Sequence, residues 1–295
     1  MYILQVSRSL KMRKIFRKGY TDMGQNDLHL GVLGERLAHT LSPEIHADLL
    51  KQQHISGTYE KFEMTREEVA GLFSWMDEHH ISGLNVTIPY KEVLYRMVDV
   101  LDDAAKEIGA VNTVLRKDGI SYGYNTDYIG VTSMFEKAGV DLSGKKIVIL
   151  GSGGACRALI YGFHEKGAGA ITVSARNESA KCALKESFPY IALSTLDDIP
   201  GGDIIINTTP VGMYPNTGIS PVNADVLSRF QVAADIVYNP LVTEFLRIAQ
   251  ENDLQIVTGL MMLVDQAIGS EEIWLGKKLD YHMGNTIHDE LAKRF

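Results

Sequence analysis

The sequence has few cysteines, no long apolar run and no excess of basic charge. Cys156 and Cys182 are the only cysteines in 295 residues, and they form neither a CxxC motif nor a zinc-type spacing. We therefore expect no disulfide framework, no metal site and a reducing compartment, the cytoplasm. No stretch approaches the ~18 apolar residues that a membrane span needs. The formal net charge of −8 argues against nucleic acid as a partner, because phosphate contacts require a basic face.

The start of the chain differs in charge from the rest. Residues 1–22 carry six basic side chains and one acidic side chain. Organellar targeting peptides share this bias, but this segment lacks their serine richness and a clean amphipathic face. We favour the hypothesis that translation begins at Met23, because Arg17-Lys18-Gly19 can be encoded by a purine-rich ribosome-binding sequence. Residues 1–27 are accordingly set apart as a basic leader.

From Leu28 onward, short apolar runs alternate with helical segments. This order is typical of an α/β protein with a mostly parallel sheet. The expected strands cover 28–34, 59–64 and 84–88, and the expected helices open at Pro43 and cover 66–79. Two further β-rich runs within 112–124 flank Lys117-Asp118-Gly119, and Asp-Gly between such runs predicts a hairpin.

A second α/β unit follows Asp127. Its first strand, which ends at Leu150, runs directly into Gly151-Ser152-Gly153-Gly154 and then into a helix. Further strands are expected over 171–175, 203–209 and 233–238, and an apolar helix is expected after Gly259. The chain length also suits two domains of ordinary size.

The glycine turn is the first candidate binding site. Cys156 stands where the third glycine of G-x-G-x-x-G would be, so the pattern alone is weak. A buried strand before it, a helix after it and another strand about twenty residues on form the βαβ context of a dinucleotide site. There the backbone approaches the pyrophosphate at a helix N-terminus. A glycine-rich turn without a ligand is the alternative.

The choice of cofactor depends on the end of the second strand. NAD enzymes place a carboxylate there on the ribose 2′-hydroxyl. Here the strand ends in Ser174-Ala175-Arg176-Asn177, and a guanidinium can hold a 2′-phosphate by two charge-assisted hydrogen bonds. NADP is therefore the expected cofactor, while the nearby Glu178 keeps NAD open.

Several ordered motifs, which together span roughly residues 28–276, resemble the shikimate dehydrogenase family. The resemblance implies NADP-linked, reversible reduction of 3-dehydroshikimate to shikimate in aromatic amino acid biosynthesis, with two domains closing over a cleft. The motifs are His39-Thr40-Leu41-Ser42-Pro43, Asn85-Val86-Thr87-Ile88-Pro89-Tyr90-Lys91, Gly109-Ala110-Val111-Asn112-Thr113, Asn125-Thr126-Asp127, the glycine turn, Tyr238-Asn239-Pro240 and the run from Gly259 to Gln266.

Lys91 and Asp127 resemble the catalytic pair of that family. Hydride transfer between an alcohol and a ketone needs a group that supplies or removes the hydroxyl proton. A protonated lysine, with an ordinary pKa of ~10.4, is a competent acid for the reduction but a poor base near neutral pH. Because a close carboxylate raises a lysine pKa, Asp127 does not make Lys91 a better base. Two roles stay open for Lys91, namely a base tuned by desolvation and a group that orients the substrate and stabilises charge.

The resemblance also implies the binding residues. Ser42 is expected as the N-cap of a helix with proline in its first position, a place where anions bind well. Thr40 and Ser42 are expected to bind the substrate carboxylate. Many members of the family carry serine at position 40, and the added methyl group of Thr40 narrows the carboxylate site. The choice between shikimate and quinate therefore stays open. The resemblance implies that Thr87, Asn112, Asp127 and Gln266 bind the ring hydroxyls and that Tyr238 lies near the nicotinamide. The expected cofactor ligands are Gly151, Ser152, Gly153, Gly154, Ala155, Arg176, Asn177, Thr208 and Gly259.

The predicted organisation is a two-domain α/β protein. Residues 28–127, completed by C-terminal helices over 259–295, are expected to form the substrate domain, and residues 128–258 a Rossmann-like cofactor domain. Two other functions remain open, a quinate or dual quinate/shikimate dehydrogenase and a catalytically idle sensor of NADP or shikimate. The sequence leaves both a monomer and a homodimer open.

The leader hypothesis predicts the mass of the natural protein. In protein purified from its native host, intact mass spectrometry should show a chain that begins at Met23 or at the residue after it. A mass that includes residues 1–22 would contradict the hypothesis.

Overall fold

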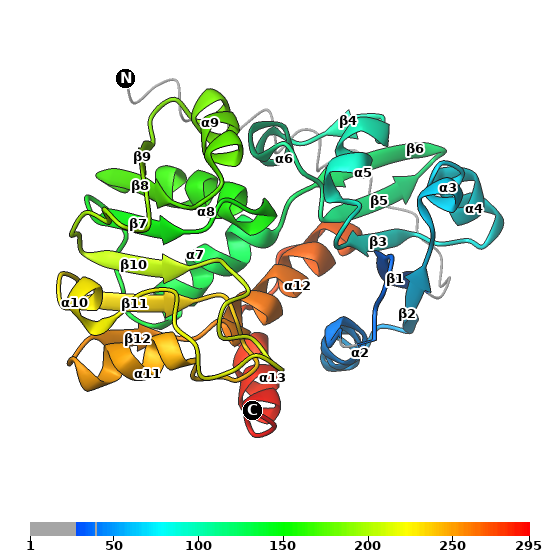
Figure 1. Ribbon diagram of the computed structural model, residues 1–295. Coiled ribbons are helices and arrows are strands. Elements are labelled where there is room, and N and C mark those ends of the chain that lie inside the picture. Colours follow the sequence, from blue (N-terminus) through cyan, green and yellow to red (C-terminus); the bar gives the residue numbers. More distant parts are fainter. Residues whose placement is uncertain (1–27, 39) are drawn as a thin grey trace, which may run out of the picture.

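The computed structural model describes residues 28–38 and 40–295, so the basic leader and His39 lie outside the described residues. The described chain forms two α/β units, each built on a six-stranded sheet (Figure 1). The predicted fold class is confirmed. Within the described part of the chain, no helix is long and apolar enough to cross a membrane.

The first sheet has the strand order β2-β1-β3-β5-β6-β4. Three of its five pairings are parallel, whereas β5 pairs with both β3 and β6 in the antiparallel direction. Its strands are β1 (Leu28–Gly34), β2 (Gly57–Glu63), β3 (Gly83–Val86), β4 (Val100–Leu101), β5 (Thr113–Lys117) and β6 (Ile120–Tyr124).

The hairpin predicted within 112–124 is confirmed. β5 and β6 pair in register from Thr113 with Tyr124 to Lys117 with Ile120. The connecting residues Asp118 and Gly119 both have positive φ, 52° and 74°. A two-residue turn of this kind matches the twist of paired strands, which explains the Asp-Gly sequence.

The helices of the first unit differ from the prediction in one place. The single helix expected over 66–79 is two helices, which are separated at Ala70 and Gly71. Glycine has low helix propensity, and a capping box at Thr65 already completes the first short helix. The helices are α2 (Ser42–Gln52), α3 (Arg66–Val69), α4 (Leu72–Glu78), α5 (Lys91–Met97) and α6 (Asp103–Ile108).

The second sheet is wholly parallel, with the order β12-β11-β10-β7-β8-β9. This is the Rossmann order, in which the chain reverses direction across the sheet between β7 and β10 and leaves a crevice there. The strands are β7 (Lys146–Leu150), β8 (Ala170–Ser174), β9 (Ala192–Ser194), β10 (Ile204–Asn207), β11 (Val232–Asp235) and β12 (Gln255–Val257), and the helices are α8 (Gly154–Glu165), α9 (Glu178–Ser187), α10 (Ala224–Leu227) and α11 (Glu244–Glu251).

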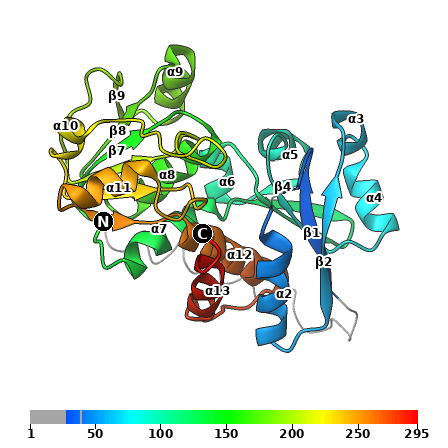
Figure 2. The ribbon, with the colours of Figure 1, turned by 60° about the horizontal axis from the view of Figure 1, so that its bottom comes forward.

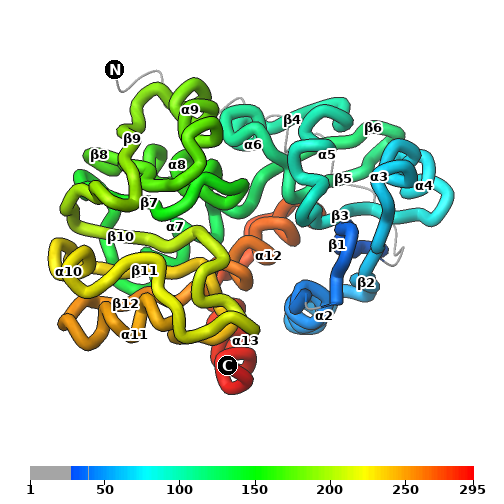
Figure 3. The backbone as a smooth tube through the Cα atoms, viewed as in Figure 1, coloured from blue at the N-terminus to red at the C-terminus, as the bar shows by residue number. Residues whose placement is uncertain are grey.

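Two helices connect the units. α7 (Asp127–Lys137) and α12 (Leu260–Leu275) lie against each other; α12 runs between the two sheets, and α7 packs with β7 and α8 of the second unit (Figures 1 and 3). They pack so closely that a Cβ at Gly130 would lie 2.4 Å from the Met262 carbonyl oxygen. α12 and α13 (Met283–Ala292) also pack on α2, which brings the C-terminal helices to the first unit (Figure 2).

Candidate active site

Lys91 and Asp127 meet between the two units. Lys91 is the first residue of α5, and Asp127 is the first residue of α7. The Lys91 Nζ atom donates to Asp127 Oδ2 at 2.6 Å, with 28% of the lysine side chain and 12% of the aspartate side chain exposed. A cation at a helix N-terminus is unfavourable, and the carboxylate offsets this. The partial exposure leaves the pair accessible to a ligand.

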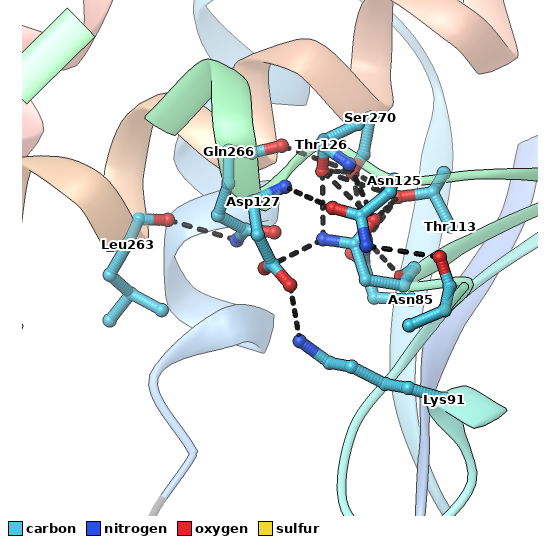
Figure 4. A network of polar contacts seen from close by, with 11 residues as sticks. Asn85, Lys91, Thr113, Asn125, Thr126, Asp127, Leu263, Gln266 and Ser270 are labelled. Carbon is cyan, nitrogen blue, oxygen red and sulfur yellow. Dashed lines mark hydrogen bonds and ion pairs between the residues drawn. The ribbon is translucent and has the colours of Figure 1, made fainter. Parts of the chain in front are cut away.

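Asn112 fixes the other oxygen of the carboxylate. Its Nδ2 donates to Asp127 Oδ1 at 2.8 Å, and its Oδ1 accepts from the Thr126 backbone N–H at 2.7 Å. The Asp127 backbone N–H donates to Asn125 Oδ1 (Figure 4). The Asp127 carboxylate is therefore held between an amide and an ammonium group. Asn112, predicted as a ligand of a ring hydroxyl, has the added role of orienting Asp127.

A buried polar network continues behind Asn112. Ser270 of α12 accepts from Asn85 Nδ2 at 2.8 Å, and its hydroxyl also lies 2.8 Å from that of Thr113. Thr126 joins the network through Ser270 and Asn112 (Figure 4). Sequence reasoning did not assign Asn85, Thr113, Thr126 or Ser270 to the site. Asn85, Thr113 and Thr126 lie inside motifs that are named above. For Ser270, the only signal in the sequence is its position four residues after Gln266, on the same face of a helix.

Thr40 and Ser42 lie together at the start of α2. Thr40 Oγ1 donates to Ser42 Oγ at 3.1 Å and accepts from the Ser42 backbone N–H at 3.3 Å. The prediction that Ser42 caps this helix is wrong, because Leu41 is the N-cap and Ser42 is already helical. Leu41 has helical φ and ψ, and the N–H of Ser42, the first residue of the helix, donates to the Thr40 hydroxyl. Both hydroxyls remain at a helix N-terminus.

The other predicted substrate ligands lie on separate elements. Gln266 packs on the first turn of α7, where a Cβ at Gly130 would be 3.1 Å from the Gln266 Cβ, and its Nε2 donates to the Leu263 carbonyl. Tyr238 packs edge-on against Phe295, and burial raises the pKa of its hydroxyl. Within the described residues, neither Thr87 nor Tyr238 hydrogen-bonds to Lys91 or Asp127.

A cavity of about 480 Å³ opens at the carboxyl end of the parallel sheet. Gly151, with φ of +109°, admits no side chain, because a Cβ would lie 2.7 Å from Thr208 Oγ1. Gly153 caps α8 without a side-chain hydrogen bond, and neither Gly153 nor Gly154 has a neighbour that a Cβ would meet within 4 Å. The helix N-terminus thus offers open N–H groups, which fits a pyrophosphate.

The end of β8 forms another side of this cavity. Arg176 and Asn177 both line it, and Asn177 caps α9 by accepting from the Ala180 N–H at 3.0 Å. Glu178, the acid that kept NAD open, pairs instead with Lys181 at 2.7 Å. Among the described residues, the lining of the cavity at the end of β8 contains a guanidinium and no carboxylate.

The cavity gathers most of the predicted cofactor residues but not all of them. Gly154, Ala155 and Gly259 are not part of its lining, and a Cβ at Gly259 would lie 2.4 Å from the Ile236 carbonyl oxygen. Apart from Thr208, the sequence analysis did not include the loops that follow β9 and β10, because no local pattern marks them as neighbours of the glycine turn. The missed lining residues are Leu150, Ser174, Ala175, Leu196, Thr209, Pro210, Val211, Ile219, Ser220 and Pro221.

His79 and His80 follow α4 and stand apart from the predicted site residues in the sequence. The His79 ring stacks on Trp75, and its Nδ1 lies 2.9 Å from the Trp75 carbonyl oxygen. Among residues 28–38 and 40–295, no group of three or more His, Cys, Asp or Glu is arranged to hold a metal ion.

A Rossmann sheet with a glycine turn, joined to another α/β unit at a lysine–aspartate pair, defines a class of protein: the dinucleotide-dependent oxidoreductases. Comparisons with known proteins identify the family within this class. The model of the shikimate dehydrogenase substrate binding domain matches residues 32–114. The NADP(+) shikimate dehydrogenase of Clostridium perfringens (strain SM101 / Type A) is 42% identical over 267 residues, which cover 90% of this chain and 98% of that protein.

Solved structures agree with this relationship. Shikimate dehydrogenase 1 of Peptoclostridium difficile is 41% identical with a TM-score of 0.82, and the alignment covers 90% of this chain and 98% of that one. The enzyme of Thermus thermophilus, in complex with NADP(H) and shikimate, is 32% identical with a TM-score of 0.82 and coverages of 89% and 99%. The chain belongs to the shikimate dehydrogenase family.

The environment of Cys156 predicts its reactivity. Cys156 is fully buried in α8, and burial raises the pKa of its thiol to about 12, whereas Cys182 is exposed. Because the thiolate is the reactive form, titration of the native protein at pH 8 with a disulfide reagent should modify Cys182 alone. Cys156 should react only after denaturation, and rapid modification of both thiols in the native state would contradict this assignment.

Proposed function

We propose that this protein catalyses the reversible, NADP-dependent reduction of 3-dehydroshikimate to shikimate, in the cytoplasm. The observation that carries the proposal is the Lys91–Asp127 pair, held at 2.6 Å and partly exposed between the two units. Residues 28–127 with 259–295 bind the substrate in this proposal, and residues 128–258 bind the cofactor.

The cofactor, Lys91 and Asp127 have separate roles in the proposed reduction. NADPH, when bound at the glycine turn, supplies the hydride for the substrate ketone. Lys91 donates a proton from Nζ to the oxygen of that ketone as its negative charge develops, and the exposed part of the lysine allows reprotonation from solvent. Asp127, oriented by Asn112, accepts a hydrogen bond from the same substrate hydroxyl in the alcohol product.

The two ends of the substrate are bound by different elements. Thr40 and Ser42 at the start of α2 bind the carboxylate, where the helix N-terminus favours an anion. Thr87, Asn112 and Gln266 bind the ring hydroxyls, and Tyr238 covers the nicotinamide side. The carboxylate therefore sets the position of the ring, and the ketone carbon lies toward Lys91.

The catalytic role of Lys91 predicts a large loss of turnover. Replacing Lys91 with alanine should lower kcat for shikimate oxidation by about 10²- to 10⁴-fold, because the general acid–base group is removed. The assay follows reduced nicotinamide absorbance for shikimate and quinate, each with NADP and with NAD. Lys106→Ala is the matched control, since Lys106 forms an exposed pair with Asp103 within α6 and should keep full activity.

The outcomes separate the alternatives. Shikimate with NADP as the preferred pair supports the proposal, and preferred oxidation of quinate would replace it with a quinate dehydrogenase. Binding of NADP and shikimate without any turnover would indicate an idle sensor. A variant Lys91→Ala with wild-type kcat would remove the lysine from the mechanism.

Arg176 sets the preference for NADP in this proposal. A charge-assisted pair with the 2′-phosphate is worth about 1.5–3 kcal/mol, so Arg176→Ala should raise the KM for NADP by about 10- to 100-fold. NAD has no 2′-phosphate, so its KM in the same variant should change less than about twofold and serves as the internal control. An unchanged KM for NADP would contradict the assignment.

A further inference from the structure

His46 and Glu271 form an ionisable pair inside the first unit, away from the Lys91–Asp127 pair. His46 Nδ1 lies 2.8 Å from Glu271 Oε1, and both side chains are 0% exposed. His46 belongs to α2, four residues after Ser42, and Glu271 belongs to α12, five residues after Gln266. The pair therefore joins the two helices that carry predicted ligands for opposite ends of the substrate.

Packing alone does not require this pair. Ile45 and Leu49 of α2 already pack on Val264 and Ile268 of α12 in a common apolar cluster. Within the described residues, His46 Nε2 and Glu271 Oε2 are buried without a hydrogen-bond partner. A buried pair with open polar atoms is commonly no more stabilising than apolar side chains of similar volume. A role other than holding the helices together therefore has to explain it.

Tyr59 connects the pair with the substrate pocket. Its ring lies on the His46 ring, with centroids 4.0 Å apart and planes 6° apart. Its hydroxyl donates to Asn85 Oδ1 at 2.8 Å. Burial raises the pKa of Tyr59 well above its ordinary value, a hydrogen bond with Ser42 lowers it and the charge of Glu271 raises it further. The hydroxyl therefore stays protonated and donates to Asn85.

The Tyr59 hydroxyl also fixes the orientation of the Asn85 side-chain amide. With its oxygen facing Tyr59, Asn85 directs Nδ2 to the Asn112 carbonyl and to Ser270. The backbone and side chain of Asn112 then lead to Asp127. Tyr59 consequently contacts both sides of the predicted pocket. Its ring lies on His46 of α2, the helix that carries Ser42, and its hydroxyl donates to Asn85, which in turn bonds to Asn112.

We propose that Tyr59 is a positioning residue for substrate binding, and that the His46–Glu271 pair keeps its ring in place. Tyr59 acts through Asn85 on one side and through the stacked ring of His46 on the other, so it sets the spacing between α2, which carries Thr40 and Ser42, and the groups that hold the ring. This inference rests on the proposed function, because it concerns the binding of shikimate.

The experiment measures KM and kcat for shikimate and KM for NADP in single variants of the full chain. Tyr59→Phe keeps the stacked ring and removes the hydrogen bond to Asn85. We expect it to raise the KM for shikimate by about five- to tenfold, in line with the loss of one hydrogen bond, while kcat and the KM for NADP change less than about twofold. Tyr190→Phe is the matched control, since Tyr190 also stacks on a histidine, His164, at 4.0 Å in the second unit.

A second pair of variants tests the support behind Tyr59. Glu271→Ala should raise the KM for shikimate in the same way, because it releases the His46 ring. Glu271→Gln, which retains an oxygen for His46 Nδ1, should return the KM to within about twofold of the wild type. Glu272→Ala is the control on the same helix, since Glu272 pairs with Lys278 and the Leu279 N–H instead.

The results distinguish this inference from the proposed function. A wild-type protein that does not oxidise shikimate overturns the function and this inference with it. An active wild type whose Tyr59→Phe variant keeps its KM for shikimate overturns the inference alone. The inference also fails if the KM values for shikimate and NADP rise together, because a general loosening of the fold would then account for both.

Discussion

The position of one carboxylate depends on the packing of two helices that are far apart in sequence. Asp127 begins α7, so its carboxylate lies where α7 starts. The start of α7 is fixed by the close contact of Gly130 with the Met262 carbonyl oxygen on α12. Protein interiors are close-packed, and a side chain at position 130 would separate the helices and move Asp127 away from Lys91. The geometry of the Lys91–Asp127 pair is in this sense a result of helix packing.

The polar residues behind Asp127 tolerate burial because they satisfy one another. Asn112, Thr113, Thr126 and Ser270 are all almost fully buried, and each makes side-chain hydrogen bonds with other members. A fully bonded network of this kind is rigid, whereas an unmade bond in it is expensive. The proposed substrate pocket therefore has a rigid polar network on one side, and Asp127, which this network orients, holds the more exposed Lys91.

Local patterns in the sequence predicted the parts that local forces determine. The Asp118-Gly119 turn requires positive φ, and the turn at Gly151 requires a residue without a side chain. Both features could therefore be predicted from the sequence alone. The break at Gly71 and the start of α2 at Ser42 were missed although both have local causes, the low helix propensity of glycine and the bond from the Ser42 N–H to Thr40. Ser270 and Glu271 were missed for another reason: their partners come from distant elements, and a helical pattern does not show which side chains it will face.

The place of α12 in the fold has a consequence for synthesis on the ribosome. Chains emerge from the N-terminus, and domains generally fold in that order. Here α2, the first sheet, Lys91 and Asp127 precede the Rossmann sheet in the chain, whereas α12, which packs on both α2 and α7, follows it. The Rossmann sheet, whose last strand ends at Val257, has all its strands before that helix exists. The unit that is translated first therefore lacks part of its packing until α12 has been made.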